Sequence, residues 1–535
     1  MPALRFDYSG TGDSADGDVS ADQIEPWLRD VVAAASELRR RTAVKRVCLL
    51  GFRLGALLAT LAAREAAADA LVLIAPVISG RRYLRELRTM SLAGAGAANA
   101  SQSDKRAADA GGLEAGGFLL TAPTLARLSQ IDVTTGAEAP ASEVLIIDRD
   151  DLPAARAWSE TLAARGVRTH YLALPGFVKM MMTPPQFAQL PQAMLEATRA
   201  WLHDSAAGMQ HLSGALQVRG ESVPATTELT LPGNPDRAGA MLRERPLSFG
   251  PDRMLFGIVT EPQCEERRRR AVVLLNSGAD YHIGAGRIYV SIARRWARQG
   301  YIVLRMDLAG LGDSATRVGR ADDEVFPPAA IDDMRAAVDY VHAHYGVGDV
   351  TLAGLCSAAY HTLQGAIAGL PVNRLLMVNP NNLSWKEGMA LGDLQLIDVV
   401  RDGRRTRALS LQNFKRLLRG QIDVPMVARL YLHRARVAVE ALVRDAARQL
   451  HIRLPHDLGW QLQELAGRGV RVVFVFARGE PGLELLRIQG GSAVRRLGNR
   501  CRVRIIDSGD HTFTFSGPRA QLEQVLSDEL FAPPG

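Results

Sequence analysis

Short apolar runs alternate with longer amphipathic stretches over most of this chain. The runs at 46–50, 70–75 and 349–353 consist largely of apolar residues, which is typical of strands buried on both faces of a parallel sheet. Stretches such as 24–40 and 331–345 repeat apolar residues every three or four positions, which indicates amphipathic helices. This alternation predicts an α/β protein whose mostly parallel sheets are covered by helices.

An internal repeat organises the chain. The sequence LRFDYSGTGDS begins at residue 4, and LRMDLAGLGDS begins at residue 304. After each copy, a helix, a short strand, a glycine-flanked turn, another helix and another strand follow in the same order. A long-range repeat of this kind predicts two domains of one fold. We place them at 1–205 and 245–535, joined by a connector at 206–244.

The two copies differ at their starts. Residues 245–262 have the pattern of two strands and 271–275 of a third, all ahead of the second copy, whereas the first copy begins directly with the apolar residues at 4–6. The first domain therefore lacks the first strands of its sheet. Either the segment 211–245 supplies replacement strands, or the first domain is shortened.

Each copy also contains an insertion before its last strands. The first, at 79–132, shows no strand pattern and includes a Gly/Ala/Ser-rich stretch at 92–104, a composition that predicts a mobile segment. The second, at about 383–454, has a helical pattern dense in arginine.

The turn after the strand at 349–353 carries the first chemical signal. The sequence GLCSA at 354–358 places Cys356 among small neighbours between a strand and a helix. This is the pattern of a nucleophile elbow, in which strand and helix nearly touch. A thiolate is far more reactive than a neutral hydroxyl, and a helix N-terminus favours it. We predict Cys356 as the nucleophile; Ser357, one residue out of register, and a merely buried cysteine are the alternatives.

The other members of a triad are expected after the last two strands, because folds with this elbow use the chain order nucleophile, acid, histidine. Glu480 follows the strand at 470–477, and His511 follows the strand at 503–506. We predict His511 as the general base and Glu480 as the acid that orients it. The alternatives are a histidine and a carboxylate on solvated loops.

An oxyanion hole needs two backbone N–H groups. The first is expected from Ser357, the residue after the nucleophile. The second is expected from the loop after the first buried strand of the second copy, at Ser277 or Gly278. Tyr281 and His282 on the same loop are predicted to line the mouth of the substrate site in a supporting role.

The first copy lacks these features. Its elbow holds Arg53, which stays protonated and cannot act as a nucleophile. Its one nearby histidine, His170, precedes the last strand, and Asp148 at the acid position suits a turn equally well. We predict a non-catalytic domain in which Arg53 is buried against a carboxylate such as Asp13 or Asp150.

Composition narrows the function classes. The chain has 535 residues, 47% hydrophobic and 23% charged, with a net charge of +7, as in an ordinary globular protein. Aromatic residues make up only 6%, so the basic and aromatic interleaving of a nucleic-acid binder is missing. The cysteines Cys48, Cys264, Cys356 and Cys501 lie far apart, without metal-ligand spacing. We expect no metal, cofactor, disulfide framework or nucleic-acid partner.

No membrane segment is expected either. The N-terminal sequence MPALRFDYSG has no basic region followed by an apolar core, and the apolar run at 70–78 is far shorter than the roughly 20 residues that cross a bilayer. The sequence predicts a cytoplasmic protein.

The motifs resemble a known superfamily. The second copy, with NSGADYHIG, LRMDLAGLGDS, GLCSAAYH and GDHTF, is similar to the serine-aminopeptidase-like branch of the α/β-hydrolases. The first copy, with GFRLGALLA, SGRRYLRELR and LPGFVKMMMTPP, resembles hydrolase-like proteins of bacterial exopolysaccharide and exosortase systems. The resemblance implies an acyl hydrolase or acyltransferase. Because cysteine replaces the usual serine, ester or thioester chemistry is favoured over peptidase or lipase activity. The alternative is a catalytically degenerate scaffold of a biosynthetic pathway.

The resemblance also places the second insertion as a cap over Cys356. Its arginines, including Arg404 and Arg405, are predicted to bind an anionic arm of the substrate, such as a carrier-protein phosphopantetheine or coenzyme A. The alternative is a solvated helical surface.

Overall fold

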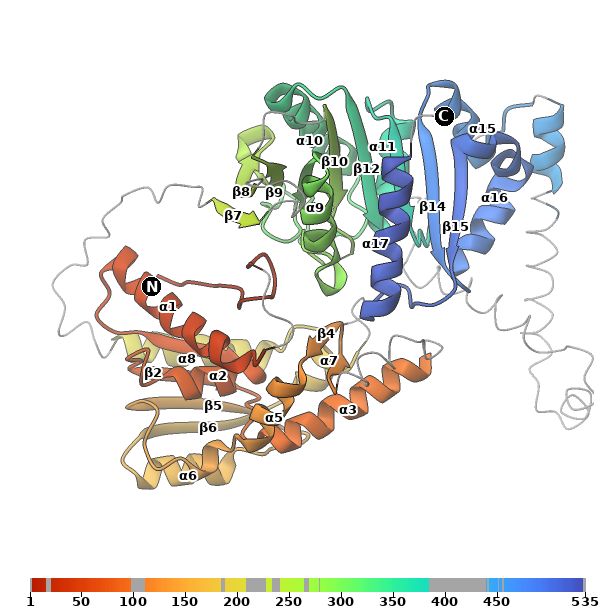
Figure 1. Cartoon of the computed structure of the whole chain (residues 1–535). Coiled ribbons are helices and arrows are strands. Elements are labelled where there is room, and N and C mark those ends of the chain that lie inside the picture. Colours follow the sequence, from red (N-terminus) through yellow and green to blue (C-terminus); the bar gives the residue numbers. More distant parts are fainter. Residues whose placement is uncertain are drawn as a thin grey trace, which may run out of the picture. The chain divides into compact units, whose positions relative to one another are not determined.

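The computed structural model describes residues 2–15, 21–97, 111–183, 188–207, 228–232, 241–263, 269–278, 280–383, 439, 442–450, 452–454 and 457–532. The chain forms two compact units, Met1–Pro224 and Ala225–Gly535, and each is described by itself. Both are α/β structures with parallel strands covered by helices (Figure 1).

The first unit contains a parallel sheet with the strand order β1-β2-β5-β6. Its strands are β1 Cys48–Phe52, β2 Ala70–Ile74, β5 Glu143–Arg149 and β6 Arg168–Leu174, and its helices are α1 Ile24–Thr42, α2 Leu54–Ala62, α3 Gly80–Ala97, α5 Ala122–Gln130, α6 Arg156–Ala164, α7 Phe177–Met181 and α8 Gln192–Ala207. Leu71 and Leu73 of β2 pack with α2 and α6, whereas Val72 and Ile74 pack with α8. The continuous apolar run of β2 is thus explained by burial on both faces.

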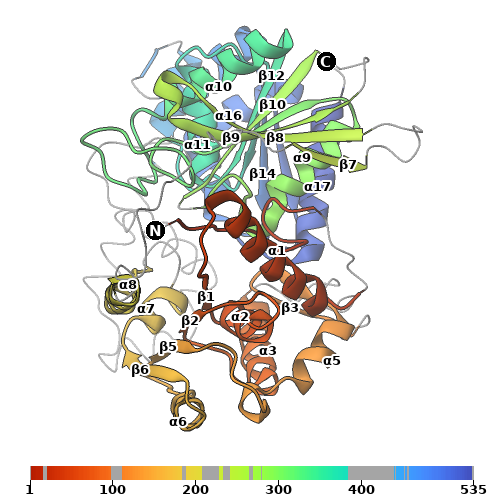
Figure 2. The same cartoon turned by 90° about the vertical axis from the view of Figure 1, so that its left-hand side faces the viewer.

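The second unit contains a larger, mixed sheet with the order β15-β14-β13-β12-β10-β11-β9-β8-β7 (Figure 2). Neighbours from β15 to β11 are parallel, and those from β11 through β9 and β8 to β7 are antiparallel. The strands are β7 Leu229–Pro232, β8 Met241–Phe249, β9 Leu255–Pro262, β10 Arg270–Leu275, β11 Ile302–Met306, β12 Asp349–Leu355, β13 Arg374–Val378, β14 Arg471–Ala477 and β15 Cys501–Ile506.

Helices cover both faces of this second sheet. They are α9 Ile288–Arg298, α10 Ala330–Tyr345, α11 Ser357–Ile367, α15 Leu458–Gly467, α16 Pro481–Leu497 and α17 Ser516–Phe531. Val273 of β10 belongs to the core that includes α10, α11, α15 and α16. The neighbouring Leu274 faces the opposite core, with Trp296 of α9 and Leu526 of α17.

The sequence repeat is also a repeat of hydrogen bonds. In the first copy the Asp13 N–H donates to the Asp7 carboxylate at 3.0 Å, and in the second the Asp313 N–H donates to the Asp307 carboxylate at 3.0 Å. The glycine before each donor has a positive φ, 48° and 56°, and a Cβ there would meet the same carboxylate. The residues that the two copies of the repeat share therefore form the same turn in both units.

Two features concern the start of the first sheet. Residues 4–6 form no strand, because no counterpart of β10 is described beside which they could pair. The described part of the connector does not complete the first sheet, since β7 pairs with β8 in the second. Of the segment 206–244, the residues 206–207 end α8 of the first unit, and the described residues from 228 onward contribute to the second unit.

The insertions also differ from expectation. The first contains a small hairpin, β3 Leu113–Ala115 and β4 Phe118–Leu120, where no strand was predicted. The Gly/Ala/Ser-rich stretch begins inside α3, and its remainder at 98–104 lies outside the described residues. Of the second, arginine-rich insertion, which is predicted to form a cap, residues 384–438 lie outside the described residues.

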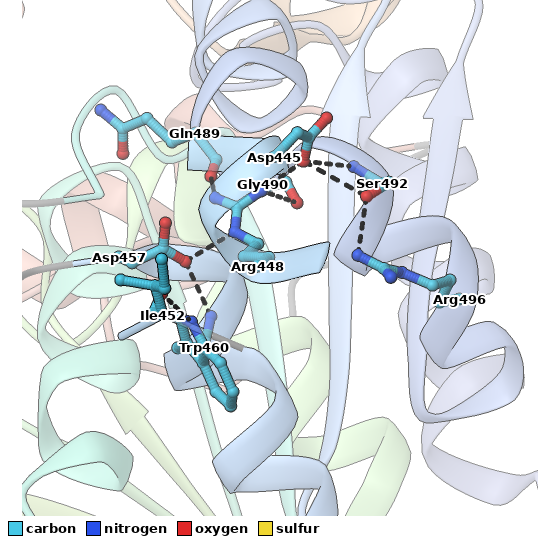
Figure 3. A network of polar contacts seen from close by, with 9 residues as sticks. All are labelled: Asp445, Arg448, Ile452, Asp457, Trp460, Gln489, Gly490, Ser492 and Arg496. Atoms are coloured by element: carbon cyan, nitrogen blue, oxygen red, sulfur yellow. Dashed lines mark hydrogen bonds and ion pairs between the residues drawn. The ribbon is translucent and has the colours of Figure 1, made fainter. Parts of the chain in front are cut away.

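The end of the second insertion is hydrogen-bonded to helix α16, which is interrupted near its middle. Helix α16 is interrupted at Gly491, where φ is 50° and ψ is −134°. Arg448, from the helical stretch at 442–449, is buried and donates to the carbonyls of Gln489 and Gly490 at the end of the first half (Figure 3). A cation that binds the last carbonyls of a helix is favourable because these groups lack intrahelical partners.

Two aspartates complete this arrangement. Asp445 accepts the N–H of Ser492, at the start of the second half of α16, at 3.3 Å, and it also binds Arg448 at 2.7 Å. Asp457, buried at the start of α15, accepts from Arg448 Nε at 2.7 Å (Figure 3). Side chains at the end of the insertion therefore cap the two halves of α16 on both sides of the break at Gly491.

Candidate active site

The elbow of the second unit lies between β12 and α11. Cys356 has φ 58° and ψ −116°, and its N–H donates to the Val378 carbonyl at 2.9 Å. A Cβ on Gly354 would lie 2.5 Å from the Cβ of Ala358, so the strand and the helix leave no room for a larger residue. This turn places the thiol at the carboxyl edge of the parallel strands, where ligands bind in α/β sheets.

His511 lies between Cys356 and Glu480. Its Nδ1 is 2.9 Å from Glu480 Oε2, and the Cys356 side chain lies close enough to the same ring to raise its pKa. The side chains of His511 and Glu480 are 31% and 11% exposed. Glu480 ends the loop after β14, directly before Pro481 of α16. The three residues predicted as a triad are therefore brought together by three separate loops.

The electrostatics of this group act on the histidine. Burial lowers the pKa of His511, but the hydrogen bonds and charges of Cys356 and Glu480 outweigh that effect and raise the pKa to about 10. At neutral pH the ring is thus held in its protonated form, able to donate at both nitrogens.

The nearer carboxylates point elsewhere. Asp507 pairs with Arg478, with Nε and Oδ1 3.0 Å apart. Asp510 accepts the N–H of Thr514 at 2.7 Å. Glu480, although more distant in sequence, is the carboxylate at the histidine ring.

Two asparagines at the site were missed by the sequence reasoning. Asn379 donates to the His511 carbonyl at 2.7 Å and accepts the Ala477 N–H at 2.9 Å. Asn381 Nδ2 lies 3.2 Å from His511 Nε2. The signal was present as NPNN at 379–382, directly after a strand whose carboxyl end reaches the site.

The expected oxyanion hole has an unexpected arrangement. The Gly278 N–H donates to the Ser357 hydroxyl at 2.7 Å, so this donor is directed at a side chain. Ser357 and Ser277 are both buried. The backbone N–H of Ser357 lies at the first position of α11, where a helix offers N–H groups without intrahelical acceptors.

The loop residues Tyr281 and His282 are placed differently from each other. His282 is buried, and its Nδ1 is 2.8 Å from the Asp307 carboxylate, so it braces the loop rather than lining a mouth. Tyr281 packs edge-on against it at 5.0 Å between ring centres. His282, Asp307 and Asp313 form a group of the kind that can bind a metal ion. The Asp307 carboxylate, however, already binds His282 and the Asp313 N–H of the repeat turn.

The first unit carries a different elbow. Arg53 pairs with Glu86 of α3 and donates to the Ala75 carbonyl at 3.3 Å. The predicted partners Asp13 and Asp150 are not the acceptors, because α3 brings Glu86 across the turn while Asp13 takes part in the repeat turn. The Arg53 guanidinium also lies 5.2 Å from the ring centre of Phe177.

The acid position of the first unit has a structural role. Asp148 is buried and accepts the N–H groups of Ala154 and Ala155, each at 2.7 Å. His170, on β6, packs edge-on with Trp201. Neither side chain is placed to replace a catalytic acid or base at Arg53.

Two further predictions concern the arginines of the second insertion and membrane-spanning helices. Arg404 and Arg405 lie outside the described residues. In the described part of the chain, no helix combines the length and apolar character needed to cross a membrane.

Comparison with known proteins gives a partial family match. Residues 2–104 match the family described as Serine aminopeptidase, S33. The match covers about a fifth of the chain and lies in the first unit, whereas the sequence motifs predicted this resemblance for the second copy. No curated protein matches the chain.

Solved structures match this chain with low sequence identity and low TM-scores. A predicted CIB-like hydrolase from Thermoplasma acidophilum is 13% identical, with a TM-score of 0.29, over 57% of this chain and 98% of that one. An alpha-beta serine hydrolase homologue from Coxiella burnetii is 13% identical, with a TM-score of 0.29, over 58% and 99%. An esterase from Pyrococcus furiosus is 10% identical, with a TM-score of 0.32, over 58% and 93%. The interpretation of the site therefore rests on the residues of this chain.

Proposed function

We propose that the second unit is an α/β-hydrolase-type acyl hydrolase or acyltransferase that uses Cys356, His511 and Glu480 on an ester or thioester. One observation carries this proposal: a histidine whose Nδ1 is 2.9 Å from a carboxylate also lies beside a thiol at a positive-φ elbow, close enough for that thiol to raise its pKa. A nucleophile, a base and an orienting acid in this order are the elements of acyl transfer.

The proposed reaction has two halves. The proton of the Cys356 thiol is held on His511 Nε2, and the sulfur attacks the carbonyl carbon of the substrate. When the tetrahedral intermediate collapses, the bond to the leaving alcohol or thiol breaks, and that group takes the proton from His511. Water or another acceptor then gives a proton to His511 and attacks the acyl-enzyme, which releases the product and restores the thiol.

The oxyanion is proposed to bind at Ser357. Its backbone N–H is one donor. Its hydroxyl accepts from Gly278 at 2.7 Å, so the hydroxyl proton is free to rotate toward the substrate and act as the second donor. The Gly278 N–H then acts through the serine instead of directly.

A thioester is the favoured substrate class. Thiolates exchange with thioesters through an acyl-enzyme of similar energy, and the leaving thiolate needs less help from an acid than an amine does. The carrier or coenzyme A arm expected at Arg404 and Arg405 remains a prediction. If it is correct, the Michaelis constant for a carrier-linked donor rises with salt, while that for a small neutral thioester does not.

We further propose that the first unit is a non-catalytic relative of the second. It shares the Asp7 turn and the elbow backbone at Arg53 but has an arginine in place of the nucleophile. If the second unit is soluble and fully active when it is expressed alone, the first unit is not required as its structural or regulatory partner.

The test is direct. The full-length protein is incubated with a small S-acyl thioester, thiol release is followed, and the acyl adduct is sought by intact-protein mass spectrometry. Cys356→Ala and His511→Ala should each lower turnover by at least about 1000-fold with unchanged thermal unfolding, and Cys48→Ala should behave as wild type. Normal turnover in both site variants contradicts the triad, and a folded protein that forms no adduct favours the scaffold alternative.

A further inference from the structure

The end of strand β13 contacts all three loops of the candidate triad. The Val378 carbonyl accepts the N–H of Cys356 at 2.9 Å. The next residue, Asn379, accepts the Ala477 N–H, where β14 leads into the Glu480 loop, and donates to the carbonyl of His511. Two consecutive residues therefore connect nucleophile, acid and base.

We propose that Asn379 is a positioning residue that fixes the His511 loop relative to the Glu480 loop, with Asn381 holding the histidine ring from its Nε2 side. This inference rests on the proposed function, in which His511 exchanges protons with Cys356. Asn379 is fully buried, and its amide uses one end for each loop, at 2.9 Å and 2.7 Å. Such a side chain sets the separation of the two loops because neither hydrogen bond can be replaced by water at a buried position.

The first unit provides an internal comparison. Ala75 has φ 44° where Asn379 has φ 42°. The Ala75 N–H donates to Ile147 at 2.7 Å, as the Asn379 N–H donates to Val475 at 2.9 Å. The backbone is therefore the same with alanine, so the turn itself does not require the amide. The amide is present in the unit that contains His511, and it is absent from the first unit, where no histidine among the described residues takes the place of His511.

Asn381 acts on the other side of the ring. Its amide nitrogen lies 3.2 Å from His511 Nε2, the atom that exchanges the proton with Cys356. A neutral ring with its proton on Nδ1 accepts from the amide N–H, whereas a protonated ring donates to the amide oxygen after the side chain rotates. The residue can therefore support the ring in both protonation states. The corresponding position after the Ala75 turn is Val77, which offers no such group.

The experiment uses the full-length protein with two variants of Asn379. Asn379→Ala reproduces the residue that the first unit uses on the same backbone. Asn379→Asp keeps the size and the acceptor for Ala477 but removes the donor to His511. Ala75→Asn is the matched control, because it introduces the amide into the unit that lacks the histidine.

Two readouts are compared. The titration of His511 is followed by NMR on histidine-labelled protein, with the signal assigned by its loss in His511→Gln, and thioester turnover is measured in parallel. In Asn379→Ala the midpoint of the His511 titration should fall by at least about one pH unit. In both variants kcat should fall about 10- to 100-fold with KM within about two-fold. The control should match wild type in both.

An unchanged titration midpoint together with an unchanged kcat in both variants overturns the inference. If Asn379→Ala does not fold, the isosteric Asn379→Asp decides. If the wild-type protein shows no thioester turnover, the proposed function fails, but the NMR titration still decides whether Asn379 positions His511. A merely structural residue would lower the unfolding temperature without moving the midpoint.

Discussion

Arg53 and Cys356 occupy the same backbone conformation in the two units of this protein. Their φ angles are 52° and 58°, and both ψ angles are −116°. Each N–H donates to the carbonyl at the end of the adjacent strand, Ile74 at 3.0 Å and Val378 at 2.9 Å. The elbow backbone is therefore the same with arginine as with cysteine, and we expect the reactivity at this position to depend on the partners that other loops supply.

Exchanging the side chain at the first elbow tests that dependence. In a variant with Cys264 replaced by serine, Arg53→Cys should react with iodoacetamide at pH 6 at least about ten-fold more slowly than Cys356, because in the described part of the chain no histidine lies beside it to stabilise a thiolate. Cys48 and Cys501 serve as internal controls, since burial raises the pKa of each to about 12. Peptide mass spectrometry gives the rates, and equal labelling at both elbows contradicts the prediction.

The pH dependence of turnover should report the contact between Glu480 and His511. The protonated ring is the acid that the leaving group needs, so activity is expected to fall as pH rises through the His511 pKa of about 10. Because Glu480 raises that pKa, Glu480→Gln should move the basic limb of kcat to lower pH and reduce kcat. Asp510→Asn is the control, since Asp510 caps Thr514 instead. A basic limb that stays in place after Glu480→Gln would falsify the assigned acid.

A buried charge cluster should dominate the stability of the antiparallel end of the second sheet. Glu244, on β8, is buried between Arg294 and Arg305, with oxygen–nitrogen distances of 2.5 Å and 3.5 Å. Glu244→Ala leaves both guanidinium groups without this counter-charge and should lower the free energy of unfolding by about 3–5 kcal/mol. Denaturant unfolding measures the change. Glu228→Ala, which removes an exposed pair with Arg243, should change it by no more than about 1 kcal/mol.

The Arg448 network should control the stability of the end of the insertion. Arg448→Ala leaves Asp457 buried without its cation and the carbonyls before Gly491 without a donor (Figure 3). We expect a loss of about 3–5 kcal/mol and faster hydrogen exchange at 442–450. Arg453→Ala is the matched control, because Arg453 is 71% exposed and pairs only with Glu464 on the surface. Similar exchange in the two variants would mean that Arg448 does not fasten this segment.

The sequence by itself determined which loops of the second unit come together at one edge of its sheet. Apolar runs specify the parallel strands, because burial on both faces requires continuous apolar side chains. In such a sheet the loops after the strands gather at one edge, so Cys356, His511 and Glu480 could be named from their positions alone. The repeat also predicted a shared turn, since its glycines are required beside Asp7 and Asp307.

Tertiary structure alone decided the partners of several other side chains. The partner of Arg53 is Glu86, because helix α3, whose direction no local pattern specifies, crosses the elbow. Residues 4–6 have strand-like composition but form no strand, since a strand exists only where a neighbour offers hydrogen bonds. Asn379 and Gly278 owe their roles to contacts across 132 and 79 positions of the chain. Such contacts depend on the packing of whole elements, which local patterns of residues do not encode.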